Sequence, residues 1–171
     1  KKPYALTKEE EDIMERLERA FENCEKLQRH MHFLLNKGGL YKVYNGNLLY
    51  HGCVPLKEDG NLKSVRIFGR AYKGKGLYEV LESYVRKGFY AMDPKEKERG
   101  KDIMWYIWLS ENSPLFGKDK MATFERYFLA EKETHKEKKN PYYLLLEDEK
   151  VVEKILKEFG LENEDAHIIN G

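Results

Sequence analysis

The sequence predicts an α+β fold that is rich in helices and contains short β-hairpins. Apolar residues recur at steps of three and four over residues 7–36, a spacing typical of an amphipathic helix. Two β-prone runs of four residues flank Asn45-Gly46, a strong hairpin signal because both residues tolerate a positive φ. With 171 residues, of which 41% are hydrophobic, the chain can form one packed domain or a large part of one.

The overall charge argues against several classes of partner. Charged residues make up 36% of the chain, above the roughly 25% of an average domain, and predict long solvated helix faces. The 31 Lys and Arg residues are balanced by 30 Asp and Glu residues, whereas general nucleic-acid binders normally carry a clear positive excess. No apolar run reaches the roughly 18 residues that span a bilayer. We therefore expect no nucleic-acid or membrane partner.

The first helix has clear signals at both ends. Thr7 and Glu10 form a capping box at its start, and the Gly38-Gly39 pair ends it. Its apolar stripe runs from Ile13 to Leu35, and we predict that this stripe packs into the core. A groove for a partner is the alternative use of the same stripe.

Two hairpins are predicted after the first helix. The first pairs residues 41–44 with 47–50, so that its second strand ends at His51. The second is predicted around Gly69 and pairs residues 65–68 with 70–73.

The second half of the chain is predicted to be mainly helical. Asp93-Pro94 is a good N-cap and first-turn pair for a helix. Gly100 argues against helix in the early part of that segment, but residues 103–109 are apolar on all sides and are predicted to be buried. Further helices are predicted at residues 76–90, 122–128 and 147–159, with a loop at 110–120, a charged linker at 131–141 and a last strand at 167–169.

His51 is the first candidate for chemistry. A neutral imidazole is a common transition-metal ligand, and ligands of α/β enzymes cluster where strands give way to loops. Gly52 leaves space beside an ion, and Pro55 stiffens the exit. Judged by residue type alone, a histidine that merely ends a strand is the more common case.

Residues 49–55 (LYHGCVP) resemble the His-Gly-Gly segment of the calcineurin-like metallophosphatases. Longer segments, at 31–56, 112–128, 134–143 and 167–171, are similar to the bacterial class III fructose-1,6-bisphosphatases. The resemblance runs from about Tyr4 to the end of the chain. It implies a layered α/β metallophosphatase sandwich in the parent enzyme, of which we expect this chain to be a fragment.

The resemblance also implies an activity. Enzymes of this family hydrolyse the 1-phosphate of fructose 1,6-bisphosphate to give fructose 6-phosphate in gluconeogenesis. They use two divalent metal ions, expected to be Mn²⁺, which activate water and stabilise charge at phosphorus. His51 is the metal ligand that carries over. The Gly-Asp-x-His, Gly-Asp-x-x-Asp-Arg and Gly-Asn-His motifs do not occur here, so we expect the isolated chain to bind no catalytic metal and to be inactive.

A second candidate site contains three cations, Lys118, Lys120 and Arg126. Gly117 gives the loop freedom for the cations to converge on a phosphate, and the arginine adds a planar fork of donors. A substrate with two phosphates needs such groups for the phosphate that does not react. A solvated loop beside a short helix is the alternative.

A third cluster follows in the charged linker. It comprises Lys136, Lys138, Lys139, Asn140 and Tyr142. It either extends the anionic pocket or forms an exposed charge run offset by neighbouring glutamates. Cys53, which follows the glycine of the metal motif, is predicted to fill space and not to act as a nucleophile.

The resemblance divides the chain into four parts of one phosphatase domain. These are a long amphipathic helix at 1–36, a hairpin with the His-Gly metal motif at 37–56, a helical insertion with the candidate substrate loop at 57–146, and a final helix and strand at 147–171. The two cysteines are too few for a disulfide framework and favour a reducing, cytoplasmic setting.

Two other functions stay open. One is a different calcineurin-like phosphatase that acts on phosphoproteins or dinucleotides. The other is a non-catalytic helical interaction module that docks a partner through the stripe of residues 7–36. An exposed strand edge also makes a homo-oligomer an open alternative.

Overall fold

The computed structural model describes residues 4–163 and 165–171. The chain divides into two units, which we name the N-terminal unit (residues 1–39) and the main unit (residues 40–171). Within the described residues, no helix is both long enough and apolar enough to cross a bilayer.

The N-terminal unit contains α1 (Lys8–Glu22) and α2 (Glu25–Lys37). The capping box at Thr7 is confirmed, but the single helix predicted over residues 7–36 is divided in two. Asn23 ends α1 because both its backbone N–H (3.0 Å) and its side-chain amide (2.8 Å) donate to the carbonyl of Arg19. A short polar side chain that competes for backbone groups favours a helix end over a helix interior.

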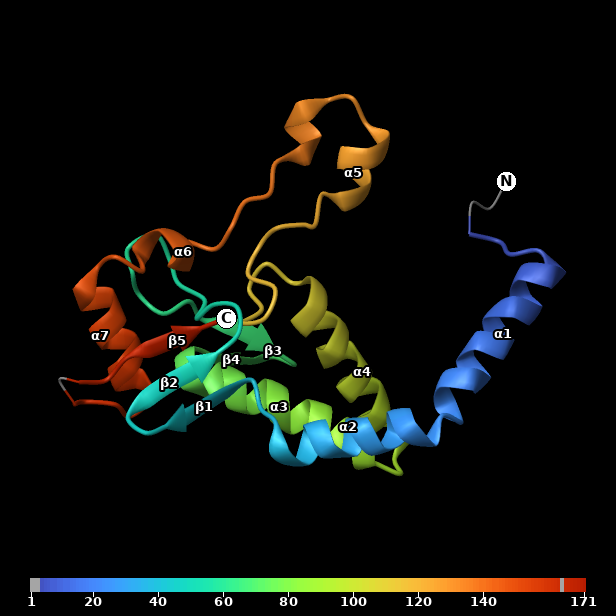
Figure 1. The fold of residues 1–171 in the computed structure, drawn as a ribbon, viewed down its shortest axis with the longest axis horizontal. Helices are drawn as coiled ribbons and strands as arrows, with labels where there is room; N and C mark the ends of the chain where they lie inside the picture. Colours follow the sequence, from blue (N-terminus) through green and yellow to red (C-terminus); the bar gives the residue numbers. More distant parts are fainter. Residues whose placement is uncertain (1–3, 164) are drawn as a thin grey trace. The chain divides into compact units, whose positions relative to one another are not determined.

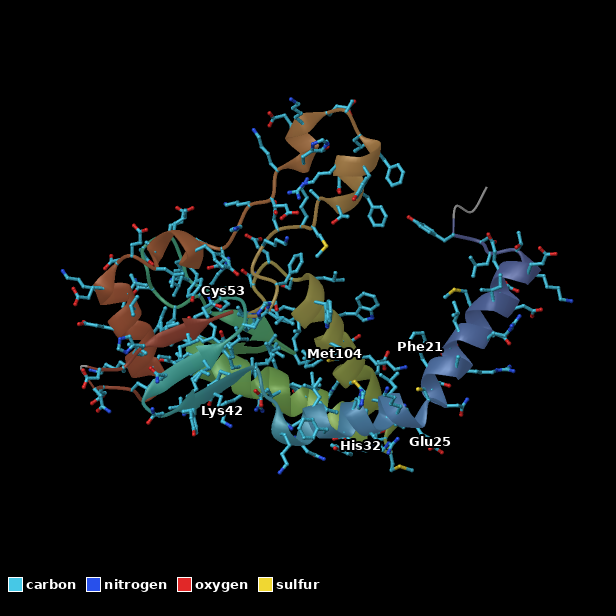
Figure 2. The ribbon with its side chains drawn as sticks, in the orientation of Figure 1. Phe21, Glu25, His32, Lys42, Cys53 and Met104 are labelled. Carbon is cyan, nitrogen blue, oxygen red and sulfur yellow. The ribbon has the colours of Figure 1, made fainter. Side chains whose placement is uncertain are left out.

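The apolar stripe of α1 is not packed as predicted. α1 has no buried residue, and Ile13, Leu17 and Phe21 are between 49% and 64% exposed. Phe21 lies near the C-terminal end of α1 (Figure 2). In the described chain this stripe therefore contributes little to a core.

The main unit is built on a three-stranded sheet of order β1-β2-β5 (Figure 1). Its strands are β1 (Tyr41–Tyr44), β2 (Asn47–Tyr50) and β5 (Ile168–Asn170). β1 pairs antiparallel with β2, and β2 pairs parallel with β5. Positive φ values at Asn45 (50°) and Gly46 (75°) confirm the predicted tight turn. Because β2 and β5 run parallel, their C-terminal ends lie side by side.

A second, two-stranded sheet carries its own core. It consists of β3 (Val65–Ile67) and β4 (Arg70–Tyr72), which confirms the second predicted hairpin. Two long helices, α3 (Gly74–Tyr90) and α4 (Pro94–Leu109), complete this part. The buried residues of this core are Val65, Ile67, Leu77, Leu81, Ile103 and Ile107.

The burial predicted for residues 103–109 is wrong for most of this stretch, which forms the C-terminal part of α4. Ile103 and Ile107 are each 4% exposed, whereas Trp105 is 66% and Trp108 61% exposed. A helix turns one face inward at steps of four, and here only that face meets the core. The chain therefore leaves two indole rings at the surface of α4.

Gly100 is part of α4 and is buried, contrary to the expectation that it would disfavour helix there. A Cβ placed on Gly100 would lie 2.6 Å from the Cα of Gly88 in α3. Two glycines thus face each other where α3 meets α4, and their backbones approach more closely than larger residues would allow.

Four shorter elements complete the main unit. They are α5 (Thr123–Phe128), a 3₁₀-helix η1 (Lys132–His135), α6 (Tyr142–Leu145) and α7 (Glu149–Glu158). The predicted helix at 122–128 and the final helix are confirmed, while the short α6 was not predicted. Figure 1 shows α5 and η1 at the end of two long connections that lead away from the three-stranded sheet.

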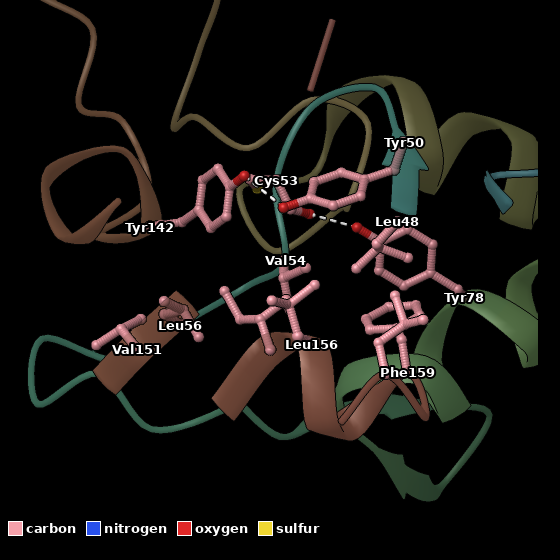
Figure 3. Close-up of a cluster of buried hydrophobic side chains, with 12 residues drawn as sticks. Leu48, Tyr50, Cys53, Val54, Leu56, Tyr78, Tyr142, Val151, Leu156 and Phe159 are labelled. Atoms are coloured by element: carbon pink, nitrogen blue, oxygen red, sulfur yellow. Dashed lines mark hydrogen bonds between the residues drawn. The ribbon is translucent and has the colours of Figure 1, made fainter. Parts of the chain in front are cut away.

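The larger core surrounds the segment that follows β2 (Figure 3). It includes Tyr50 from β2, Tyr78 from α3 and Phe159 after α7, whose rings meet edge to face. Residues 52–56 are buried within it. The predicted metal motif therefore continues straight into the core.

The contact between the two glycines predicts the effect of a small substitution. Gly100→Ala should destabilise the fold by about 1–3 kcal/mol, as overpacking of a tight contact typically does, although alanine favours helix. Denaturation of the purified chain in urea measures this change.

Gly76→Ala is the matched control, since a Cβ at Gly76 in α3 meets no atom within 4 Å. That variant should be neutral or more stable by up to about 1 kcal/mol. Equal stability of the two variants would contradict the proposed close packing of α3 on α4.

Candidate functional site

His51 lies immediately after β2 and is exposed. The backbone N–H of Gly171 donates to the carbonyl of Tyr50 (3.3 Å), which extends the parallel pairing of β2 and β5. A Cβ on Gly171 would lie 3.4 Å from Nδ1 of His51. Among the described residues, none forms a hydrogen bond with this imidazole. The ring is therefore free to bind a ligand beside the ends of both strands.

Gly52 is required by the turn that follows His51. Its φ is +93°, a conformation that favours glycine. A Cβ at this position would lie 2.2 Å from the carbonyl oxygen of Pro114. The glycine thus lets the loop containing Pro114 approach the backbone directly beside His51.

The next residue of the turn, Cys53, is held from two sides. Its backbone N–H donates to the carbonyl of Pro114 (2.7 Å), and the hydroxyl of Tyr78 donates to its carbonyl (2.9 Å; Figure 3). Burial raises the pKa of the Cys53 thiol to about 12, so the thiol stays protonated at neutral pH. This is consistent with the predicted filling role and with the absence of thiolate chemistry.

Residues 113–117 form a brace against this turn. The hydroxyl of Ser113, which is fully buried, donates to the carbonyl of Ile107 (2.6 Å) and accepts from the N–H of Leu115 (3.1 Å). A Cβ on Gly117 would lie 2.6 Å from the sulfur of Cys53. Residues 113–117, which precede the predicted phosphate-binding lysines, thus support the turn after His51.

Asn140 ties a third segment to the turn. Its side-chain oxygen accepts from the N–H of Leu56 (3.1 Å) and from the N–H of Tyr142 (3.0 Å). Asn140 is 2% and Tyr142 0% exposed. These two members of the third predicted cluster therefore belong to the core, and the interpretation that they are part of an exposed charge run is wrong.

The side chain of Asn170 closes the arrangement from β5. Its amide nitrogen donates to the carbonyl of Gly52 (2.9 Å) and to the hydroxyl of Tyr142 (3.0 Å). The Tyr142 hydroxyl also hydrogen-bonds to the hydroxyl of Tyr50 (Figure 3). Burial raises the pKa of both phenols, so they remain neutral hydrogen-bonding groups.

The three predicted phosphate-binding cations gather around the segment that contains η1. Lys118 and Arg126 both pair with the carboxylate of Glu137, at 2.7 and 3.5 Å. Lys120 donates to the carbonyl of Thr134 (2.7 Å). The hydrogen bond from Lys118 holds the pKa of Glu137 below its usual value, with a further contribution from a backbone N–H. The three cations therefore lie near one another, and the carboxylate of Glu137 partly neutralises Lys118 and Arg126.

The remaining lysines of the third cluster are exposed. Lys139 lies opposite Lys118 in an isolated antiparallel bridge, and the N–H of Lys138 donates to the carboxylate of Asp119 (2.8 Å). Lys136 pairs with Glu133 at 2.7 Å. The loop and the charged linker thus form one short ribbon whose outer face is rich in cations.

A complete metal site is not formed by the part of the chain that the structure describes. No group of three or more His, Cys, Asp or Glu side chains there could hold an ion. The exposed imidazole of His51 fits the role of one ligand, because Gly171 leaves space beside its Nδ1. The space predicted at Gly52 is instead filled by the backbone of Pro114 and Leu115.

A comparison with known protein families places the chain. The family described as Firmicute fructose-1,6-bisphosphatase matches residues 1–171. The chain belongs to this family. No solved structure gives a significant match.

Several curated relatives are named class 3 fructose-1,6-bisphosphatases. The chain is 54% identical over 172 residues to the class 3 fructose-1,6-bisphosphatase of Clostridioides difficile (strain 630), with 100% of this chain and 26% of that protein covered. It is 54% identical to that of Clostridium botulinum (strain Hall), covering 99% and 25%, and 52% identical to that of Listeria innocua, covering 99% and 26%. The chain thus spans about a quarter of the length of these relatives.

Sequence reasoning missed the polar residues that hold the turn in place. Tyr78, Ser113 and Asn170 received no role from their local patterns, since nothing in those patterns reveals a distant carbonyl partner. One signal was present: Asn140-Pro141-Tyr142 interrupts a charged run with residues suited to burial. It marks the point where the exposed linker returns to the core.

Proposed function

We propose that the protein containing this chain is a metal-dependent fructose-1,6-bisphosphatase. The observation that carries this proposal is the family match over the whole chain, together with 54% identity to class 3 fructose-1,6-bisphosphatases. The reaction would release the 1-phosphate of fructose 1,6-bisphosphate and leave fructose 6-phosphate, in gluconeogenesis. A cytoplasmic setting belongs to the same proposal, supported by the free thiols of Cys24 and Cys53.

His51 would supply one ligand of a two-metal centre, for which Mn²⁺ is the expected ion. Such ions provide positive charge for the reacting phosphate and a means to activate water. The contribution of this chain is to hold the imidazole at the joined ends of β2 and β5, with Gly171 leaving room beside its Nδ1. The other ligands would come from other parts of the full-length protein.

Lys118, Lys120 and Arg126 would bind the phosphate that does not react. Glu137 holds Lys118 and Arg126 on either side of one carboxylate, a spacing at which the same two cations would flank a phosphate. Because the loop of Pro114 and Gly117 braces the metal-motif turn, it connects this cation cluster directly to the His51 segment.

The full-length protein tests the activity directly. With Mn²⁺ it should release phosphate from fructose 1,6-bisphosphate, and a chelator should abolish the reaction. His51→Ala should lower kcat/KM by more than about a hundred-fold, since even outer-shell partners of a metal typically contribute ten- to hundred-fold. Colorimetric phosphate release measures each rate, and residues 1–171 alone should show none.

His30→Ala is the matched control, because His30 lies on α2 and is exposed. Preference for a phosphopeptide or a dinucleotide over fructose 1,6-bisphosphate would favour a different calcineurin-like phosphatase. Absence of any phosphatase activity in the full-length protein would favour the interaction module, which the exposed stripe of α1 supports.

The substrate role of the cations has a separate test. Arg126→Ala should raise KM about tenfold with little change in kcat, because a lost contact to a non-reacting phosphate weakens ground and transition states alike. Steady-state kinetics of the full-length protein provides both constants. Arg16→Ala on α1 controls for the loss of one positive charge. Unchanged KM in Arg126→Ala would remove this residue from the substrate site.

A further inference from the structure

A network of hydrogen bonds holds the residues that precede and follow His51 in the sequence. On one side, Tyr50 directly precedes the histidine, and its hydroxyl contacts that of Tyr142. On the other side, the carbonyl of Gly52 directly follows it and accepts from the amide of Asn170 (2.9 Å). The same amide reaches Tyr142 at 3.0 Å. Tyr142 and Asn170 thus join both neighbours of His51 in one network.

The network uses both hydrogens of the Asn170 side-chain amide. An amide nitrogen has two hydrogens, and the two acceptors here are the Gly52 carbonyl and the Tyr142 hydroxyl. Gly52 and Tyr142 are both buried. A buried carbonyl left without a donor is unfavourable, so loss of this amide would favour rotation of the Gly52–Cys53 peptide, which begins one residue after His51.

One other hydrogen bond holds that peptide, because its N–H, that of Cys53, donates to the carbonyl of Pro114 (2.7 Å). Gly52 has a φ of +93°, and glycine populates positive and negative φ about equally. The intrinsic preference of the residue therefore does not fix the direction of its carbonyl. The next anchor along the chain is the hydrogen bond from the hydroxyl of Tyr78 to the carbonyl of Cys53 (2.9 Å). The bond from Asn170 of β5 is the one that holds the Gly52 carbonyl itself, one residue from the imidazole.

We propose that Asn170 and Tyr142 are positioning residues for His51. They hold the 51–52 segment in the orientation in which the imidazole, beside Gly171, can bind a divalent cation. This inference rests on the proposed function, since it assumes that His51 is a metal ligand. It adds two residues that contact neither the metal nor the substrate and act through the backbone of the ligand.

Two substitutions in the full-length protein test the proposal. Tyr142→Phe keeps the ring and removes the hydroxyl, whereas Asn170→Leu keeps the branched shape and removes the amide. Each should weaken Mn²⁺ binding about ten- to hundred-fold, the usual effect of an outer-shell partner. Electron paramagnetic resonance of free Mn²⁺ measures the affinity, and thermal unfolding of the metal-free protein measures stability separately.

Tyr106→Phe is the matched control. It also removes one hydrogen-bonded phenol hydroxyl, but this hydroxyl donates to the carbonyl of Asn112 (3.0 Å) and lies outside the network. Its Mn²⁺ affinity should equal that of the wild-type protein. Hydrogen exchange of peptides covering residues 48–56 in the metal-free protein should be faster in Tyr142→Phe and Asn170→Leu than in Tyr106→Phe.

The outcomes separate this inference from the proposed function. Wild-type Mn²⁺ affinity in Tyr142→Phe and Asn170→Leu, with only a lowered unfolding temperature, would overturn the positioning role while His51→Ala still loses metal. Wild-type affinity in His51→Ala would instead contradict the proposed function itself. Should Asn170→Leu fail to fold, the more conservative Tyr142→Phe decides the question alone.

Discussion

The main unit depends on one constraint, which is the burial of the turn after β2. Residues 52–56 lie in the core, where each polar backbone group needs a partner because water is excluded. The partners come from distant parts of the chain: Tyr78 on α3, the loop at Pro114, Asn140 before α6, and Asn170 on β5. The exposed histidine at the entrance of this turn is therefore positioned by the whole unit.

This constraint also connects the two candidate parts of the site. Residues 113–117 brace the turn, and the chain then continues directly into Lys118. A phosphate bound by the cation cluster and an ion bound by His51 would thus be supported by the same short loop. The partial neutralisation of Lys118 and Arg126 by Glu137 keeps this cluster ordered, since like charges held together without a counter-ion repel each other.

Local patterns predicted the elements well, and long-range contacts explain the differences. The Asn45-Gly46 turn, the hairpin around Gly69 and the helix after Asp93 follow from residue preferences within a few positions. The break at Asn23 is also local, but the apolar periodicity of residues 7–36 outweighed it in the prediction. The exposure of Trp105 is not local, because an apolar run does not reveal which face meets a core. His51 was found by motif, whereas Asn170 was not, because its role exists only once β5 lies beside β2.

The most direct test of this account is anomalous diffraction at the manganese absorption edge from crystals of the full-length protein. We predict an anomalous peak within bonding distance of an imidazole nitrogen of His51, beside the joined ends of β2 and β5. The amide of Asn170 should still donate to the carbonyl of Gly52. Manganese peaks elsewhere, with the His51 ring uncoordinated, would contradict it.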